Sequence, residues 1–253
     1  MIITNKNRIE TFTEKGWWGE DTLYSLFKEA VNSCGDQEAL IDPENRVDIT
    51  GDAPMRLSFN QIHMTVERYA SIFFEQGLRK DDIVIIQLPN IVELPMVYLA
   101  LSKLGIICSP IPMQYGAYEI TNIIGETKPK AFISIQTFQN NPHAEQFSSV
   151  FNNDELKFAF GEIENFINLN ESNPNSELHK SQQSYVQDNP ITANDIFTIC
   201  WTSGTTGTPK GVPRSHNLWL PMAKAASFVS ETEEGDTLLN PFPMINMASI
   251  GGF

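Results

Sequence analysis

The sequence is poor in basic residues and has no long apolar run. Its 17 Lys and Arg stand against 31 Asp and Glu, which gives a net charge of −14 over 253 residues. This balance argues against nucleic-acid binding, which needs clustered Lys and Arg, and against attachment to anionic membrane surfaces. The longest apolar runs, such as Ile83–Ile86, are far shorter than the ~20 residues of a membrane-spanning helix.

Cysteine is also scarce. Cys34, Cys108 and Cys200 are odd in number and widely separated, which excludes both a disulfide framework and a paired-cysteine metal site. The first ten residues have no cationic start followed by an apolar stretch, so no secretory signal is expected. These features favour a cytoplasmic protein with reduced thiols.

The composition, 41% hydrophobic and 19% charged, is that of a globular protein. Ser58 and Gln61 form a capping box before apolar residues that recur at three- and four-residue steps as far as Phe74, which predicts a helix ending near Gly77. Buried strands are expected at residues 82–88, 106–111 and 131–135, with helices at 93–104 and 118–127 between them. This alternation predicts an α/β fold with a parallel sheet, in which layered sheets are flanked by helices.

The second half of the chain is less regular. Residues 136–189 are rich in Asn, Gln, Ser and Glu, and we expect mostly surface loop there, with one strand at 156–160. Order returns with a buried strand at 196–201. A helix is expected at 218–229, with Pro221 in its first turn, and a further strand from Leu238.

The stretch from Trp201 to Gly211 is the one segment in which residue types for chemistry are concentrated. It holds three glycines, four threonines, one serine and Lys210 directly after an expected buried strand. Glycines allow successive backbone amides to point at an anion, hydroxyl groups add donors, and the lysine adds positive charge. The spacing is neither a Walker A loop nor a nucleophile elbow. Composition and spacing alone fit a flexible hinge loop as well as a phosphate cradle.

The letters WTSGTTGTPKGV closely resemble the phosphate-binding signature of the adenylate-forming superfamily, which includes acyl-CoA synthetases, firefly-luciferase-like enzymes and peptide-synthetase adenylation domains. Residues 57–111 resemble the N-terminal run of the same family, and His216 lies where the family commonly has a histidine. The resemblance implies the N-terminal portion of a large AMP-binding domain. It divides the chain into a first α/β subdomain at about 55–190 and part of an incomplete second one, made of 1–54 with 191–253.

The resemblance also implies a reaction. Family members use ATP and Mg²⁺ to convert a small carboxylic acid to an acyl-adenylate, and then form a thioester, usually with CoA. No residue of this chain is assigned as a metal ligand. Lys210 is implied as the catalytic residue that offsets charge on the departing pyrophosphate. The residues implied to wrap the ATP phosphates are Thr202, Ser203, Gly204, Thr205, Thr206 and Gly207, together with Lys210.

Residues 240–253 resemble the family motif that lines the acyl pocket, with Asn246 in the place of a common histidine. The small and apolar neighbours of Asn246 suit an apolar acid, although plain core packing explains them equally well. The pattern is closer to acyl-CoA synthetases, including those of fatty acid metabolism, than to amino-acid adenylation domains.

Several family motifs are absent, among them the ribose-binding aspartate and the C-terminal domain with its catalytic lysine. We therefore expect this portion to be inactive alone and to expose an apolar edge through which it could self-associate. Two alternatives stay open: a truncated, non-catalytic nucleotide-binding remnant, and adenylation that feeds a carrier protein. Trp17 and Trp18 are interpreted as packing anchors.

Overall fold

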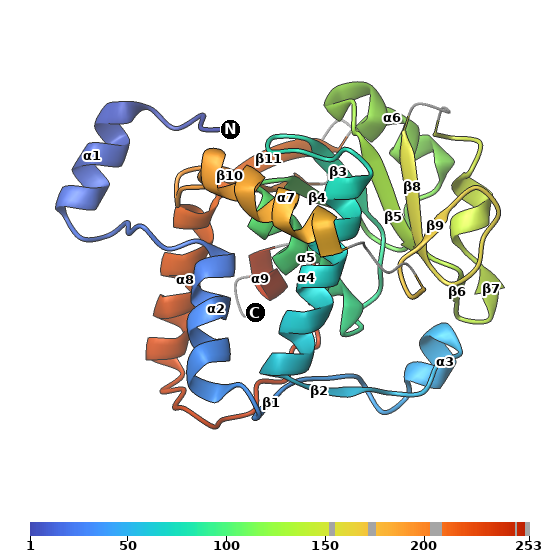
Figure 1. Cartoon of the computed structure of the whole chain (residues 1–253), viewed down its shortest axis with the longest axis horizontal. Coiled ribbons are helices and arrows are strands. Elements are labelled where there is room, and N and C mark those ends of the chain that lie inside the picture. Colours follow the sequence, from blue (N-terminus) through green and yellow to red (C-terminus); the bar gives the residue numbers. More distant parts are fainter. Residues whose placement is uncertain (152–154, 172–175, 203–208, 246, 251–253) are drawn as a thin grey trace.

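The structure is a computed structural model that describes residues 1–151, 155–171, 176–202, 209–245 and 247–250. Its main sheet has seven strands: β3 (Ile83–Ile86), β4 (Ile107–Pro110), β5 (Ala131–Ile135), β8 (Leu156–Phe160), β9 (Ile167–Asn168), β10 (Ile196–Thr202) and β11 (Lys210–Ser215). They lie in the order β11-β10-β4-β3-β5-β8-β9 (Figure 1). All neighbours are parallel except β10 and β11, which are antiparallel.

Helices surround this sheet: α1 (Lys6–Glu14), α2 (Leu23–Cys34), α3 (Arg46–Thr50), α4 (Phe59–Glu75), α5 (Glu93–Leu104), α6 (Ala117–Thr127), a 3₁₀ turn (Ala144–Phe147), α7 (Ser176–Asp188), α8 (His216–Val229) and α9 (Met247–Ile250). Two small antiparallel ribbons pair β1 (Glu38–Ile41) with β2 (Arg56–Ser58) and β6 (Thr137–Phe138) with β7 (Asn141–Pro142). Helix α1 has no buried residue and stands away from the body in Figure 1.

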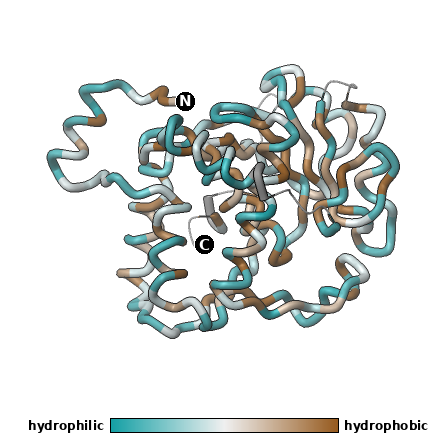
Figure 2. Tube along the Cα trace, in the orientation of Figure 1, coloured by the Kyte–Doolittle hydropathy of each residue, from teal (hydrophilic) through white to brown (hydrophobic). Residues whose placement is uncertain are grey.

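The central strands are buried on both faces, as their unbroken apolar sequence predicts. Val84 and Ile86 of β3 pack in the larger core cluster with α4 and α5, whereas Ile85 points to the opposite face and packs with Ile120 and Ile123 of α6. Figure 2 shows the hydrophobic residues concentrated in these strands. The predicted α/β fold is confirmed.

The helices on the larger core cluster begin and end where the sequence predicts. Ser58 Oγ accepts from the Gln61 amide at 3.3 Å and Gln61 Oε1 accepts from the Ser58 amide at 2.8 Å, which is the predicted capping box at the start of α4. All twelve residues of α5 are buried, including the polar residues Glu93, Ser102 and Lys103. It ends at Gly105, whose φ of +68° is a left-handed conformation that favours glycine.

Three details of the prediction were wrong. Residues 136–189 are more than surface loop: besides the expected strand β8, they supply β9 and helix α7, and Phe158 and Leu169 are fully buried. Helix α8 begins at His216, so Pro221 lies inside the helix and not in its first turn. No strand forms at Leu238 and Leu239, whose side chains are 64% and 83% exposed because no neighbouring strand pairs with them among the described residues.

Two further observations concern the chain as a whole. None of the helices in the described residues is long and apolar enough to cross a membrane. Strands β10 and β11, from the later part of the chain, extend the same sheet as β3, β4, β5 and β8. The division into subdomains at about 55–190, and at 1–54 with 191–253, stays a proposal.

Candidate functional site

The two ends of the glycine- and threonine-rich segment are held together by a β-hairpin. Thr202 is the last residue of β10 and Lys210 the first of β11, and the two are paired in the antiparallel register. Directly opposed residues of such a pair project to the same face, so both side chains lie on one side of the hairpin. Both are exposed, and among the described residues Lys210 has no ion-pair partner. Its ammonium group is therefore available to an anion.

The hairpin is fixed to the sheet below it. The indole Nε1 of Trp201 donates to Ser109 Oγ of β4 at 2.9 Å, and Ser109 is fully buried. Gly211 lies opposite Trp201. A Cβ at position 211 would come within 2.9 Å of the Ile199 side chain and 3.2 Å of the Trp201 ring, so only glycine fits without a shift of β10. The segment thus starts from the carboxyl edge of the sheet, where α/β proteins place ligands.

Most of the implied phosphate-binding residues cannot be placed. Ser203, Gly204, Thr205, Thr206 and Gly207 lie outside the described residues, as does Asn246 of the implied acid pocket. The described residues contain no group of three or more His, Cys, Asp or Glu side chains that could hold a metal ion. The structure therefore places Thr202 and Lys210 together and leaves the other implied contacts as predictions.

His216, which the resemblance singled out, is the first residue of α8 and is 2% exposed. Its ring stacks on Phe197 of β10 with centroids 5.1 Å apart, and its Nδ1 accepts from the Leu23 amide at 3.2 Å. Burial lowers the pKa of His216 to about 4, against an opposing effect of Asp195. The imidazole is thus neutral at pH 7 and, since Nδ1 is an acceptor, carries its proton on Nε2.

A small apolar cavity of about 20 Å³ lies between His216 and Ile250, and Ile250 belongs to the segment implied to line the acid pocket. Phe197 and Trp219 also line this cavity. Met244 and Ile250 are 7% and 5% exposed and belong to the larger core cluster. These two side chains therefore have packing roles. Ile245 is only partly buried and lies directly before Asn246.

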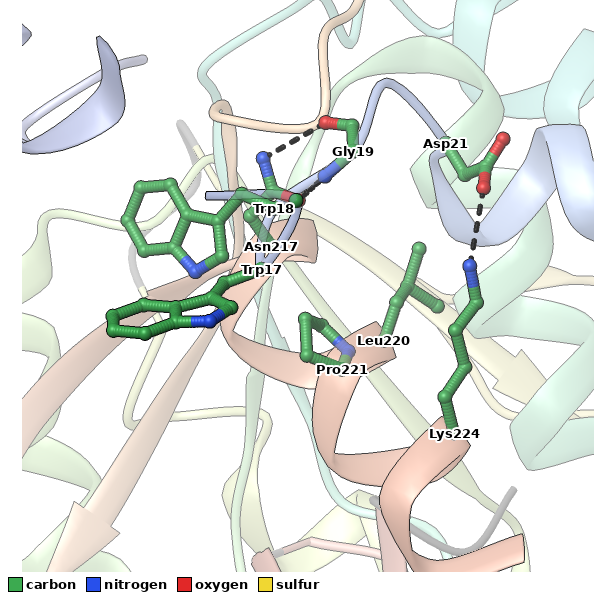
Figure 3. Close-up of a pocket in the computed structure, with 9 residues that line it drawn as sticks. Trp17, Trp18, Gly19, Asp21, Asn217, Leu220, Pro221 and Lys224 are labelled. Atoms are coloured by element: carbon green, nitrogen blue, oxygen red, sulfur yellow. Dashed lines mark hydrogen bonds and ion pairs between the residues drawn. The ribbon is translucent and has the colours of Figure 1, made fainter. Parts of the chain in front are cut away.

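A larger hollow of about 280 Å³ lies between the first residues of α8 and the chain before α2 (Figure 3). Trp18 is buried there, as expected of a packing anchor, and meets Phe12 edge to face. Trp17 is 57% exposed, so the anchor interpretation holds for only one of the pair. The Asn217 amide clamps the backbone of Gly19, and Lys224 pairs with Asp21 at 3.4 Å on the rim. Asn217 therefore ties the start of α8 to the chain before α2.

Asn90 and Tyr98 belong to the run that resembles the family's N-terminal part, but the sequence analysis assigned no role to them or to Ser109. Each holds a segment that is remote in the chain: Asn90 and Tyr98 bind residues 242–244, and Ser109 binds Trp201. Their own neighbours in sequence carry no signal of these contacts. The pairing of β10 with β4 brings Ser109 and Trp201 together, and the tertiary fold brings the other partners together.

The family model described as AMP-binding enzyme matches residues 27–253. The chain belongs to this family. The AMP-binding enzyme match covers the hairpin, His216 and the segment after α8, which are the places where the resemblance was first seen.

Several curated relatives of this AMP-binding chain are CoA ligases. It is 26% identical over 198 residues to a probable CoA ligase, CCL5, of Humulus lupulus, a match of 78% of this chain and 35% of the relative. It is 25% identical over 217 residues to a long-chain-fatty-acid–CoA ligase, FadD13, of Mycobacterium tuberculosis, with 85% of this chain and 40% of the relative covered. The chain thus spans well under half the length of these relatives.

Among solved structures, the apo structure of MbtA from Mycobacterium smegmatis superposes with a TM-score of 0.79 at 19% identity, covering 98% of this chain and 45% of that one. At this identity the likeness concerns the fold. It confirms that the described elements have the fold of the matched 45% of the MbtA chain.

Proposed function

We propose that this chain carries the ATP-phosphate-binding part of an acid–thiol ligase that forms acyl-adenylates and then acyl-CoA thioesters. The observation that carries the proposal is the family match over residues 27–253, which includes a hairpin that pairs Thr202 with Lys210. The CoA-ligase relatives support the same reaction class. The proposed partners are ATP, CoA and a small carboxylic acid.

In the first half-reaction, a carboxylate oxygen of the acid attacks the α-phosphorus of ATP, and the bond to the bridging oxygen breaks to release pyrophosphate. In the second, the thiol sulfur of CoA attacks the acyl carbon, AMP leaves, and the thiol proton passes to solvent. The chain's part is positioning and charge stabilisation, which dominate phosphoryl chemistry. Lys210 would stabilise negative charge on the departing pyrophosphate, with Thr202 beside it on the same hairpin face.

Mg²⁺ would neutralise charge on the ATP phosphates in this reaction. Because the described residues form no cluster suited to a metal, we assign it no protein ligand and derive no step through it. The described cysteines are free thiols, and the proposal places the enzyme in the cytoplasm, where ATP and CoA are supplied. The acid is proposed to be apolar and to lie near Asn246.

The test is pyrophosphate release by the native polypeptide that contains this chain, with ATP, Mg²⁺ and a panel of fatty, alicyclic and aromatic acids. Lys210→Ala should slow acyl-adenylate formation about 100- to 1000-fold, since loss of one donor at a developing negative charge typically costs that much. Its melting temperature should not change, because Lys210 is exposed. Lys6→Ala, an exposed lysine on α1, is the control and should leave the rate unchanged. No pyrophosphate with any acid would refute the proposed reaction.

A second candidate is a truncated nucleotide-binding remnant without catalysis, which would keep the pair of Thr202 and Lys210 on the hairpin. A native mass near 28.5 kDa, with ATP binding but no pyrophosphate release, would support it. A larger native mass with activity would support the ligase. Supplying CoA or a phosphopantetheinyl carrier protein to the active enzyme would then identify the thiol acceptor.

A further inference from the structure

Asn90 binds the backbone of the segment that precedes Asn246. Its side-chain Nδ2 donates to the Phe242 carbonyl at 2.7 Å, and its Oδ1 accepts from the Met244 amide at 2.9 Å. Tyr98, fully buried in α5, donates its hydroxyl to the Met244 carbonyl. Three hydrogen bonds from one turn and one helix thus hold three consecutive residues that are about 150 positions away in the chain.

Only a carboxamide of this size meets both requirements at position 90. The Phe242 carbonyl needs a donor and the Met244 amide needs an acceptor, and an asparagine side chain offers one of each. Aspartate would keep the acceptor alone, and leucine would keep the volume and neither bond. Asparagine, aspartate and leucine at position 90 would therefore keep two, one and none of these hydrogen bonds, and the three variants can be compared in one experiment.

The turn that carries Asn90 is itself rigidly held. It follows β3 at the carboxyl edge of the sheet, and the Val92 amide next to it donates to the buried carboxylate of Asp42 at 2.9 Å. Glu93 then forms a bidentate pair with the buried Arg46, with distances of 2.6 and 3.0 Å. Asn90 thus projects from a fixed base.

The segment that it holds has little structure of its own. Residues 240–245 are in neither helix nor strand, so no backbone ladder fixes them. Apart from the contacts with Asn90 and Tyr98, the side-chain hydrogen bonds of this stretch among the described residues join Ser249 to Asn240 and to Phe242. The Met244 side chain packs in the larger core cluster, and Asn90 and Tyr98 fix the backbone of Phe242 and Met244 by hydrogen bonds.

We propose that Asn90 is a positioning residue for the carboxylic acid substrate. By setting the backbone of residues 242–244, it sets the direction in which the next residue, Ile245, meets the acyl group of an apolar acid. This role rests on the proposed function. It assigns to the turn after β3 a part in acid selection, separate from the binding of ATP by the β10–β11 hairpin.

The first measurement is hydrogen exchange of this chain, followed by mass spectrometry on peptides that span residues 240–250. In Asn90→Leu, exchange at these amides should be about tenfold faster or more. The reason is that local opening of the segment no longer has to break the hydrogen bonds of Asn90 to Phe242 and Met244. Asn90→Asp should give an intermediate increase, and Tyr98→Phe an increase of the same kind. Asn141→Leu, whose amide bonds only within its own turn to Gln139, is the matched control and should change nothing there. Unchanged exchange in Asn90→Leu would overturn the proposal.

The second measurement uses the native polypeptide that contains this chain and separates the acid from ATP. In Asn90→Asp, KM for the acid should rise about fivefold or more while KM for ATP stays within about twofold, because the defect is confined to the acid side. An equal rise in both would indicate a general structural role and overturn the proposal. If the wild-type polypeptide releases no pyrophosphate, the role toward the acid falls with the proposed function, while hydrogen exchange still decides whether Asn90 holds the segment.

Discussion

His216 illustrates how one buried side chain can link two segments of the fold. It packs on β10 through Phe197, and it satisfies the backbone amide of Leu23 at the start of α2. Because Nδ1 must stay unprotonated to accept that bond, the contact exists only with a neutral ring. Protonation of His216, the histidine that the family resemblance singled out, would therefore destabilise the folded state.

This effect of protonation predicts a pH-dependent stability. Below about pH 6.5 the unfolded chain takes up a proton at His216, whereas burial keeps the folded ring neutral until about pH 4. The unfolded state thus binds more protons between these values, and the free energy of unfolding falls as pH falls through this window. The contribution is complete above pH 6.5. Between pH 6.5 and about pH 4, His216 lowers the free energy of unfolding by at most about 3 kcal/mol.

His216→Phe keeps an aromatic ring on Phe197 and cannot titrate. Urea unfolding at several pH values should show a shallower loss of stability between pH 6.5 and 4 than in the wild type. At pH 7 the variant should be less stable by about 1 kcal/mol, because the Leu23 amide loses its acceptor. His143, whose pKa burial also lowers to about 4, supplies the comparison. His143→Phe should also make the loss of stability with falling pH shallower, independently of position 216. An unchanged pH dependence in His216→Phe would contradict the assignment of this effect to His216.

At the scale of elements, a buried charge cluster joins α3 to α5. Arg46 is 3% exposed and contacts the carboxylates of Asp42 and Glu93, which are also buried. Burial raises the pKa of Glu93, and the bonds from Arg46 work against that rise. Asp42 also accepts from the amides of Met55 and Val92, so the cluster connects the β1–β2 ribbon with the turn after β3.

Removal of this arginine should be costly. Arg46→Met leaves two buried carboxylates without their counter-charge, and breaking such a cluster typically costs about 3–5 kcal/mol of unfolding free energy. Arg56→Met is the matched control, since Arg56 also forms a two-bond pair with a glutamate, Glu38, but on the surface. Denaturant unfolding should show a large loss for position 46 and no measurable loss for position 56. Equal losses would mean that burial does not govern the cluster.

The difference between local and distant contacts explains which elements the sequence predicts. The limits of α5 and the capping box of α4 depend on neighbours within one turn, and they are confirmed. Helix α7 was missed because it is largely polar and packs on α4 through contacts such as that of Tyr185 with Phe74. Strand β11 was missed because its sequence, KGVPRS, has no apolar pattern and depends on pairing with β10.

The candidate site follows the same rule. The segment from Trp201 to Gly211 is recognisable because all its residues are consecutive. The roles inferred for Asn90 and Tyr98 could not be foreseen, because their partners lie 152 and 146 positions later in the chain. Their contacts follow from the tertiary fold, which places residues 242–244 beside the turn after β3 and beside α5, and no local pattern contains this placement.

At the scale of the whole molecule, apolar side chains gather on the surface of one stretch. Five large hydrophobic residues between positions 228 and 242 are more than half exposed: Phe228, Val229, Leu238, Leu239 and Phe242. Their exposed fractions range from 57% to 84%. Exposure on this scale within fifteen residues is typical of a surface that another polypeptide covers. The chain covers 35% and 40% of the two CoA-ligase relatives named above.

We therefore expect this chain, produced alone, to self-associate in a concentration-dependent manner that sedimentation velocity can follow. Phe228→Ser combined with Leu239→Ser should weaken the association without lowering the melting temperature, because both side chains are already exposed. Met64→Ser with Tyr118→Ser is the matched control: both residues are 72% exposed but lie on α4 and α6. An equal effect of the two double variants would point to general stickiness, and a wild-type chain that stays monomeric at every concentration would refute the prediction. Selective weakening at positions 228 and 239 would identify this stretch as the surface through which the chain self-associates.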